Sequence, residues 1–195
     1  TRRSQLKYRK LFRPRIVAHT HLMDVVLLYG PPGVGKQSIA NALSMQTGYP
    51  VFPNHLTLDA VHTILPRGHP EAPHALHKYR IWLTELAAST GCPGLLHTIV
   101  YKLGESDAYV NALNDTILPH KGRLLPVQLI CRQDILEQRL IDPSRSDKKI
   151  KSLDKLQALR ARADIDKPIP YLKKSRFGQY RTVDRRVRYG HHRTV

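Results

Sequence analysis

The sequence predicts an α/β fold, in which helices cover both faces of a doubly wound parallel sheet of about five strands. Continuous apolar runs alternate with segments of helical spacing along most of the chain. A glycine-rich turn joins the first apolar run to the first helix. The net charge of +17 is concentrated at the two ends, which predicts basic terminal arms around a single domain.

The strands are expected where apolar runs end in glycine or in polar residues. Residues 24–30 (DVVLLYG) and 94–101 (GLLHTIVY) have the continuous apolar character of strands buried on both faces. The run 49–52 is a short strand, and 123–131 is a further strand with Pro126 near its start. Residues 179–184 are the only candidate for a last strand.

Helices are expected between these strands, at residues 36–47, 56–65, 74–89, 106–118, 134–140 and 153–163. In the segment 74–89 the spacing of Leu76, Tyr79, Ile81, Leu83 and Leu86 suggests a long helix with Trp82 near its middle. The predicted organisation is a basic arm at 1–23, a domain at 24–170 with a lid at about 141–152, and a basic extension at 171–195.

Bulk composition narrows the class of protein. The chain has 195 residues, of which 41% are hydrophobic, enough for one domain with a real core. It contains no apolar run of about 18 residues and no apolar segment typical of a secretion signal, so we expect a soluble protein without a membrane partner. Cys92 and Cys131 do not form a disulfide framework, which favours a reducing, intracellular compartment, and both suggest small buried side chains.

Residues 30–38 (GPPGVGKQS) form a phosphate-binding motif after a strand and before a helix. The glycines allow backbone N–H groups to turn toward one anion, the helix N-terminus adds its partial positive charge, and the lysine reaches the β and γ phosphates. This predicts the P-loop NTPase fold, with ATP or GTP bound by Gly30, Pro31, Pro32, Gly33, Val34, Gly35, Lys36, Gln37 and Ser38.

Gln37 stands where a serine or threonine usually binds Mg²⁺, and an amide is a poorer ligand for so hard an ion. Ser38 follows one residue later and is the candidate Mg²⁺ ligand. This order, with GPPGxGK before it, resembles the adenylate kinase loop more than the loop of regulatory GTPases.

The resemblance extends beyond the loop to bacterial P-loop proteins of the shikimate-kinase-like and chloramphenicol-phosphotransferase-like type. Matching stretches within residues 24–170 are GPPGVGKQSIA, TGYPVFPNHLTLD, GLLHTIVY, LLPVQLIC, LEQRL and PSRSDKKI. The resemblance implies an ATP-binding kinase core with a lid that carries arginines. By that analogy Arg139 and Arg145 would clamp the transferring phosphoryl group.

The expected carboxylates of such a kinase are sparse. The strand 94–101 ends at Tyr101 without an acid, where many P-loop proteins place an aspartate. Asp59 is the candidate catalytic base, with a solvated helix position as its alternative, and Asp107 is explained as a charge in the first turn of a helix. His55 would line an acceptor pocket or pack, and no cysteine or acid at ligand spacing supports a metal site at His69, His74 or His77.

The two ends of the chain carry most of its charge. Residues 1–23 hold seven basic residues and no acid, and residues 167–195 hold nine against one acid, whereas 24–166 is nearly neutral at +2. Aromatic residues interleave with both arms, which suits phosphate contacts and base stacking on RNA. The predicted RNA-binding residues are Arg2, Arg3, Lys7, Arg9, Lys10, Arg13, Arg15, Lys173, Lys174, Arg176, Arg181, Arg185, Arg186, Arg188 and Arg193.

These features predict a nucleotide-binding, kinase-fold protein anchored on RNA, with rRNA and neighbouring proteins of a ribonucleoprotein as partners and with catalysis either retained or lost. The basic extensions are similar to those of organellar ribosomal proteins, so a mitochondrial ribosome subunit or assembly factor is the expectation. No DNA specificity is evident. The alternatives are a soluble ATP-dependent small-molecule kinase, a protein that holds ATP or GTP without hydrolysing it, and, for the charges, solvated tails or an N-terminal targeting remnant.

Overall fold

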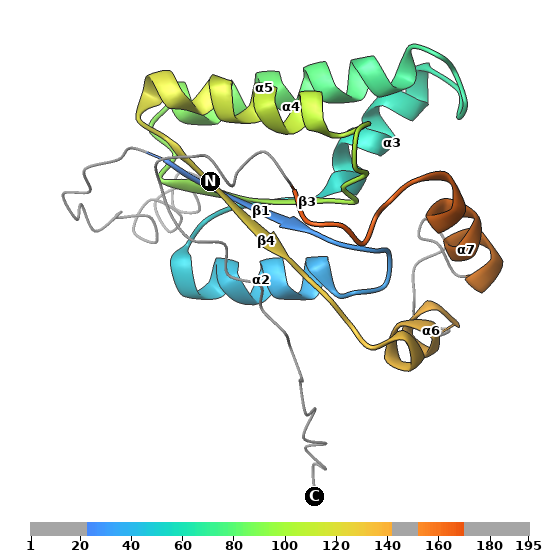
Figure 1. The fold of residues 1–195 in the computed structure, drawn as a ribbon. Helices are drawn as coiled ribbons and strands as arrows, with labels where there is room; N and C mark the ends of the chain where they lie inside the picture. The colour runs from blue at the N-terminus through green and yellow to red at the C-terminus, as the bar shows by residue number, and fades with distance from the viewer. Residues whose placement is uncertain (1–22, 142–151, 170–195) are drawn as a thin grey trace, which may run out of the picture.

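A computed structural model describes residues 23–141 and 152–169 (Figure 1). The two basic arms, the lid residues 142–151 and the candidate strand at 179–184 lie outside the described residues. The described helices include none with the length and apolar character needed to cross a membrane.

A parallel sheet of four strands in the order β2-β3-β1-β4 forms the centre of the described fold. The strands are β1 (Asp24–Tyr29), β2 (Val51–Phe52), β3 (Gly94–Ile99) and β4 (Arg123–Gln128). The last residue of β1, Tyr29, is paired with Ile99 of β3 and with Gln128 of β4. The carboxyl ends of these three strands therefore lie at one edge of the sheet.

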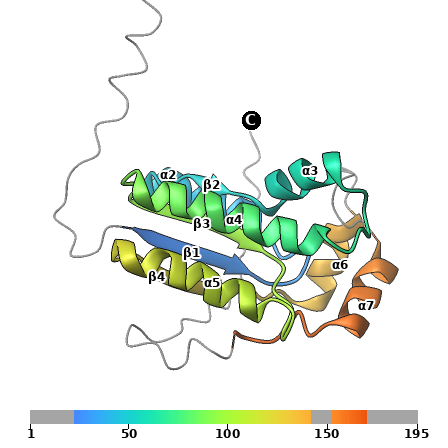
Figure 2. The same ribbon diagram turned by 90° about the horizontal axis from the view of Figure 1, so that it is seen from above.

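Helices cover both faces of this sheet, as the sequence predicts. One face carries α2 (Lys36–Thr47), and the other carries α4 (Ala72–Ser89) and α5 (Asp107–Ile117), which lie side by side (Figures 1 and 2). Beyond the carboxyl ends of the strands lie α3 (Asn54–Ile64), α6 (Gln133–Ile141) and α7 (Leu153–Arg162). A 3-10 turn, η1 (Leu118–His120), follows α5.

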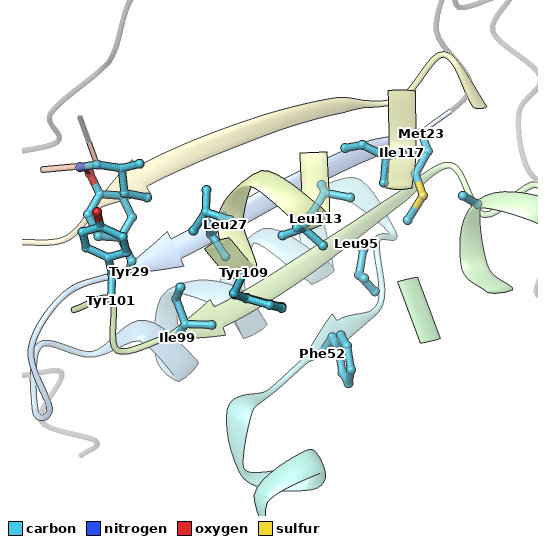
Figure 3. Packing of buried hydrophobic residues seen from close by; sticks show 14 residues of the cluster. Met23, Leu27, Tyr29, Phe52, Leu95, Ile99, Tyr101, Tyr109, Leu113 and Ile117 are labelled. Atoms are coloured by element: carbon cyan, nitrogen blue, oxygen red, sulfur yellow. Dashed lines mark hydrogen bonds between the residues drawn. The ribbon is translucent and has the colours of Figure 1, made fainter. Parts of the chain in front are cut away.

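The main core lies between the sheet and the α4/α5 layer (Figure 3). β1 contributes Val25 and Leu27, and α5 contributes Leu113 and Ile117, all of them fully or almost fully buried. A smaller cluster around Leu28 packs on the opposite face against α2. β1 thus buries side chains on both faces, which explains its continuous apolar sequence.

The amino end of the sheet is held by an ion pair between neighbouring strands. Arg123 of β4 donates from Nε and Nη2 to the two carboxylate oxygens of Asp24 at 2.8 and 2.9 Å. Tyr49 Oη lies 3.4 Å from the same carboxylate. Because its charge is paired with Arg123, Asp24 can begin a strand although the residue is only 9% exposed.

The α/β class, the parallel sheet and the helices on both faces are confirmed, and the described part of the sheet has four of the expected five or so strands. Pro126 lies in β4, which within the described sheet pairs only with β1, so its missing N–H faces the unpaired side. The two cysteines are partly rather than fully buried.

The long helix predicted at 74–89 is confirmed as α4, and its buried face includes polar residues. Its buried residues are Ala72, Leu76, Arg80, Thr84 and Ala88, at a spacing of four. Leu86 is 46% exposed, and Trp82, near the middle of the helix, is 54% exposed. The apolar spacing indicated the helix, whereas an arginine and a threonine occupy part of its buried face.

Replacing Leu27 by alanine should lower the free energy of unfolding by about 3 kcal/mol, because the change leaves a cavity beside the central strand. Leu56→Ala removes the same atoms from a side chain that is 61% exposed and should cost less than about 1 kcal/mol. Urea denaturation of both variants measures the difference. Equal losses would contradict the placement of β1 at the centre of the core.

Candidate functional site

The glycine-rich loop connects the carboxyl end of β1 to the amino end of α2 (Figure 1). Gly30 has φ 144°, and a Cβ at this position would lie 2.4 Å from the backbone oxygen of Leu129. A side chain at Gly30 would therefore collide with the backbone that follows β4. This close approach sets where the loop leaves the sheet.

The loop then turns and continues into the first turn of α2. Gly33 and Gly35 have φ 91° and 97°, and no side chain caps the helix that starts after Gly35. Backbone N–H groups in the first turn of a helix lack intrahelical partners and attract anions. The conformation fits the phosphate cradle that the motif predicts.

Lys36 is the first residue of α2, and its side chain folds back along the loop. Its Nζ donates hydrogen bonds to the backbone oxygens of Gly30 at 2.7 Å and Pro31 at 2.9 Å. The ammonium group is thereby held at the mouth of the loop, where a phosphate bound to the backbone would meet it.

Gln37 and Ser38, the two residues considered for Mg²⁺, occupy different environments. Gln37 donates from Nε2 to Oδ1 of Asn41 at 3.0 Å, one turn along the helix. Ser38 is exposed. The oxygens in this turn that could hold a magnesium ion are therefore the Ser38 hydroxyl and Gln37 Oε1.

Helix α6 forms a wall beside the loop. Arg139 Nη1 donates to the backbone oxygen of Val34 at 3.4 Å, and a Cβ on Gly35 would lie 3.7 Å from the same nitrogen. Leu136 and Leu140 approach Gly33 from the same helix. The structure thus brings Arg139, predicted as a phosphoryl clamp, next to the phosphate loop across 105 residues of sequence.

Of the remaining predicted site residues, some lie in α3 and the others lie outside the described residues. Asp59 and His55 lie in α3, which follows β2 beyond the carboxyl edge of the sheet, and both are partly buried. Arg145 and every predicted RNA-binding residue lie outside the described residues. The described part of the chain contains no group of three or more side chains arranged to hold a metal ion.

An acid does stand near the end of β3, although the strand itself has none. Tyr101, fully buried two residues after β3, donates a hydrogen bond from Oη to the carboxylate of Asp107. Asp107 is in the first turn of α5, as predicted. The ring of Tyr101 packs edge-on against that of Tyr29, with centroids 5.7 Å apart, immediately before the phosphate loop (Figure 3). Sequence reasoning missed this link.

Sequence reasoning also missed a buried polar cluster around Arg80. Its guanidinium donates to Thr57 and Asn54 of α3 and lies 6.0 Å from the ring centre of Tyr109. Tyr109 Oη is in turn 3.2 Å from Nδ1 of His97. The four-residue spacing of the buried face of α4 is the sequence pattern that could have drawn attention to Arg80.

Burial controls the charge of this cluster. His97 is 1% exposed, and burial, with a smaller effect of the nearby Arg80 charge, lowers the pKa of His97 to about 3. Burial likewise raises the pKa of Tyr109 and lowers that of His77. His97 is therefore a neutral hydrogen-bonding partner at neutral pH, and the charge of the cluster belongs to Arg80.

No family model matches the chain, and no curated protein matches it. Solved structures, by contrast, do match the chain. A sugar kinase from Janibacter sp., in an unliganded structure, aligns with a TM-score of 0.54 and 16% identity over 76% of this chain and 81% of that one. A gluconokinase from Sinorhizobium meliloti aligns with a TM-score of 0.50 and 16% identity over 78% and 79% of the two chains. These likenesses show a P-loop kinase-like fold.

The free energy of unfolding should fall as the pH is lowered from 6.5 toward 3. The folded pKa of His97, about 3, lies below the ordinary value of 6.5, so the unfolded chain takes up this proton first. The contribution of neutral His97 to the free energy of unfolding is therefore complete above pH 6.5 and is lost toward pH 3. The free energy of unfolding should change by up to about 1.4 kcal/mol per pH unit over this range. Urea denaturation at several pH values measures the slope.

The His97→Gln variant is the control for that measurement, because it keeps a polar side chain of similar reach but removes the titrating group. Between pH 6.5 and 4, its free energy of unfolding should change less steeply with pH than that of the unmodified chain. The expected difference is up to about 1.4 kcal/mol per pH unit, which corresponds to one proton. Parallel pH profiles for the two proteins would show that His97 is not buried in its neutral form.

Proposed function

We propose that this protein binds ATP in its glycine-rich loop and transfers the γ-phosphoryl group to a small hydroxylated acceptor. The observation that carries the proposal is the position of two cations on the loop: the ammonium of Lys36 at the backbone of Gly30 and Pro31, and the guanidinium of Arg139 at Val34. Both face the backbone that would bind phosphate. The P-loop kinase-like fold supports the same conclusion.

The residues of the loop would act mainly by holding charge. Backbone N–H groups between Gly33 and the first turn of α2 donate to the phosphates, and Lys36 exchanges its backbone acceptors for phosphate oxygens. Arg139 then lies on the side where negative charge develops during transfer. Such preorganised cations supply most of the catalysis in phosphoryl transfer.

The acceptor would enter from the side of α3, where Asp59 is the proposed base for its hydroxyl proton. A Mg²⁺ ion, held by Ser38 or Gln37 Oε1 and by the phosphates, would neutralise charge on the nucleotide. Arg145, in the lid segment, is proposed to complete the phosphoryl clamp. The kinases with similar folds include a sugar kinase and a gluconokinase, which supports a small polyhydroxylated acceptor.

The arrangement at Lys36 predicts the effect of removing its charge. Lys36→Ala should weaken ATP binding by about tenfold to a hundredfold, because a hydrogen bond to a charged group contributes roughly 1.5 to 3 kcal/mol. It should also abolish turnover. Lys78→Ala, an exposed lysine on α4, is the matched control and should bind ATP normally. Calorimetric titration with ATP checks both, and normal binding by Lys36→Ala would exclude this loop as the site.

A second role is proposed for the terminal arms, which would anchor the protein on RNA. The observation that favours it is the charge distribution: the segment 24–166 is nearly neutral, while the two ends together carry +15. A small anionic substrate needs only a few convergent charges, whereas a polyanion engages many. In its specific form, the proposal is that the arms anchor the protein on the RNA of a mitochondrial ribosome, with or without surviving catalysis.

Salt dependence tests the second role. If about half of the arm charges contact phosphates, the logarithm of the RNA-binding constant should fall against the logarithm of salt concentration with a slope on the order of −5 to −7. Fluorescence anisotropy with a labelled structured RNA, measured on the full chain, gives the slope. A slope near zero would contradict RNA anchoring by the arms, whatever the outcome for ATP.

A further inference from the structure

The outer face of α4 carries an exposed tryptophan between two other large side chains. Trp82 is 54% exposed, and Leu86, one turn later, is 46% exposed. Tyr79, one turn earlier, stacks on the Trp82 ring with centroids 6.1 Å apart and an interplanar angle of 17°. Spacings of three and four residues place these side chains on one face of the helix. Tyr79, Trp82 and Leu86 are termed the Trp82 stripe below.

The Trp82 stripe differs from the single exposed apolar residues of other helices. Met45 of α2, for example, is 84% exposed, and isolated residues of this kind are common on protein surfaces. The stripe instead contains two aromatic rings that are already stacked on each other. Tyrosine and tryptophan offer large contact areas with few rotatable bonds. Covering the stripe with a partner would therefore cost little side-chain entropy.

Two charged side chains lie beside the stripe. Lys78 is four residues before Trp82, and Glu85 is three residues after it. At about 3.6 residues per turn, both charged positions fall on the same side of Trp82, whereas Tyr79 and Leu86 fall on the other side. Lys78 and Glu85 are exposed, and neither forms an ion pair with a residue that the structure describes. The outer face of α4 thus has a charged side and an apolar side.

This pattern is complementary to itself in an antiparallel pair of helices. A two-fold axis between two copies of α4, at the level of Trp82, sets residues before Trp82 opposite residues that follow Trp82 by a similar distance in the partner. Lys78 then lies opposite the partner's Glu85, and Tyr79 lies opposite the partner's Leu86. The symmetry repeats both contacts, and the two Trp82 rings meet at the centre. The pair would gain two ion pairs beside one continuous apolar seam.

Other occupants of this face match it less well. A parallel pair of α4 helices would set the charged side of one helix against the apolar side of the other. RNA attracts surfaces with an excess of positive charge, whereas the exposed residues between 78 and 86 carry one cation and one anion, Lys78 and Glu85. The charge pattern therefore favours a second copy of this chain.

We propose that two copies of this chain associate through the outer face of α4, as an antiparallel pair related by a two-fold axis at Trp82. α4 and α5 form the outer layer on their side of the sheet, so a second copy can approach α4 from there (Figures 1 and 2). The inference does not rest on the proposed phosphotransfer, because the stripe and the phosphate loop share no residue.

The first test follows Trp82 itself, which is the only tryptophan of the sequence. The full chain, freed of nucleic acid by nuclease, is diluted from about 1 mM to about 1 µM at an ionic strength of about 0.15 M, which screens repulsion between the basic ends. The emission of Trp82 should move to longer wavelength as dimers dissociate and water reaches the ring. Sedimentation velocity should show the mass falling to that of one 22.3 kDa chain over the same range.

Two results of the dilution would overturn the inference. One is a single monomeric species at every concentration. The other is an emission that does not depend on concentration, as expected where a segment of the same chain covers Trp82. Quenching of Trp82 by added RNA in a chain that stays monomeric would likewise overturn it and would assign the face to nucleic acid.

The second test reverses the charges. Lys78→Glu sets acids opposite each other at both ends of the pair, and Glu85→Lys does the same with cations. Each variant alone should associate about tenfold or more weakly than the unmodified chain. An equimolar mixture of the two variants should associate again, because every cation of one then lies opposite an acid of the other. A mixture that stays as weak as its components would overturn the inference.

A pair of apolar substitutions supplies the matched control. Trp82→Ala should weaken the association by about a hundredfold or more, since a tryptophan at the centre of an interface contributes strongly to binding. Met45→Ala removes an even more exposed side chain from α2 and should leave the association unchanged. Equal effects of the two variants would contradict the proposed interface. Lys36→Ala should associate normally, so this proposal and the proposed ATP site fail by different measurements.

Discussion

The parallel pairing of β1 with β3 on one side and β4 on the other is the interaction on which the rest of the structure depends. It buries β1 on both faces and brings three strand ends to one edge of the sheet. The phosphate loop leaves the sheet at this edge, where Gly30 passes too close to the Leu129 carbonyl for a side chain to fit. The geometry of the loop is thus a consequence of strand packing together with the absence of a Cβ.

Three different helices each hold a cation by hydrogen bonds to neutral groups. Lys36 belongs to α2 and Arg139 to α6, and both contact the backbone of the phosphate loop. Arg80 belongs to α4 and is held by α3. Rigid helices hold these cationic groups in place at little entropic cost. Asp59 on α3 and Asp107 beside Tyr101 provide carboxylates in the same part of the fold.

The near neutrality of the folded segment separates the two proposed roles. The charges that favour RNA lie at the chain ends, whereas the residues that favour phosphotransfer lie on the sheet edge and its flanking helices. The two roles therefore draw on different residues, and one protein can combine them. The similar solved structures concern only the residues on the sheet edge and its flanking helices, because their likeness to this chain is one of fold.

The sequence by itself determined the α/β class, the positions of the four described strands and the phosphate loop, because apolar runs and glycine motifs express local constraints on the backbone. Only the tertiary structure decided which charged groups meet. Arg139 reaches Val34 across 105 residues, Tyr101 meets Asp107 from the end of another element, and Arg80 reaches Asn54 across 26 residues. Apolar spacing indicated helix α4 but not its buried arginine, which is stabilised by hydrogen-bonding partners that only folding brings to it.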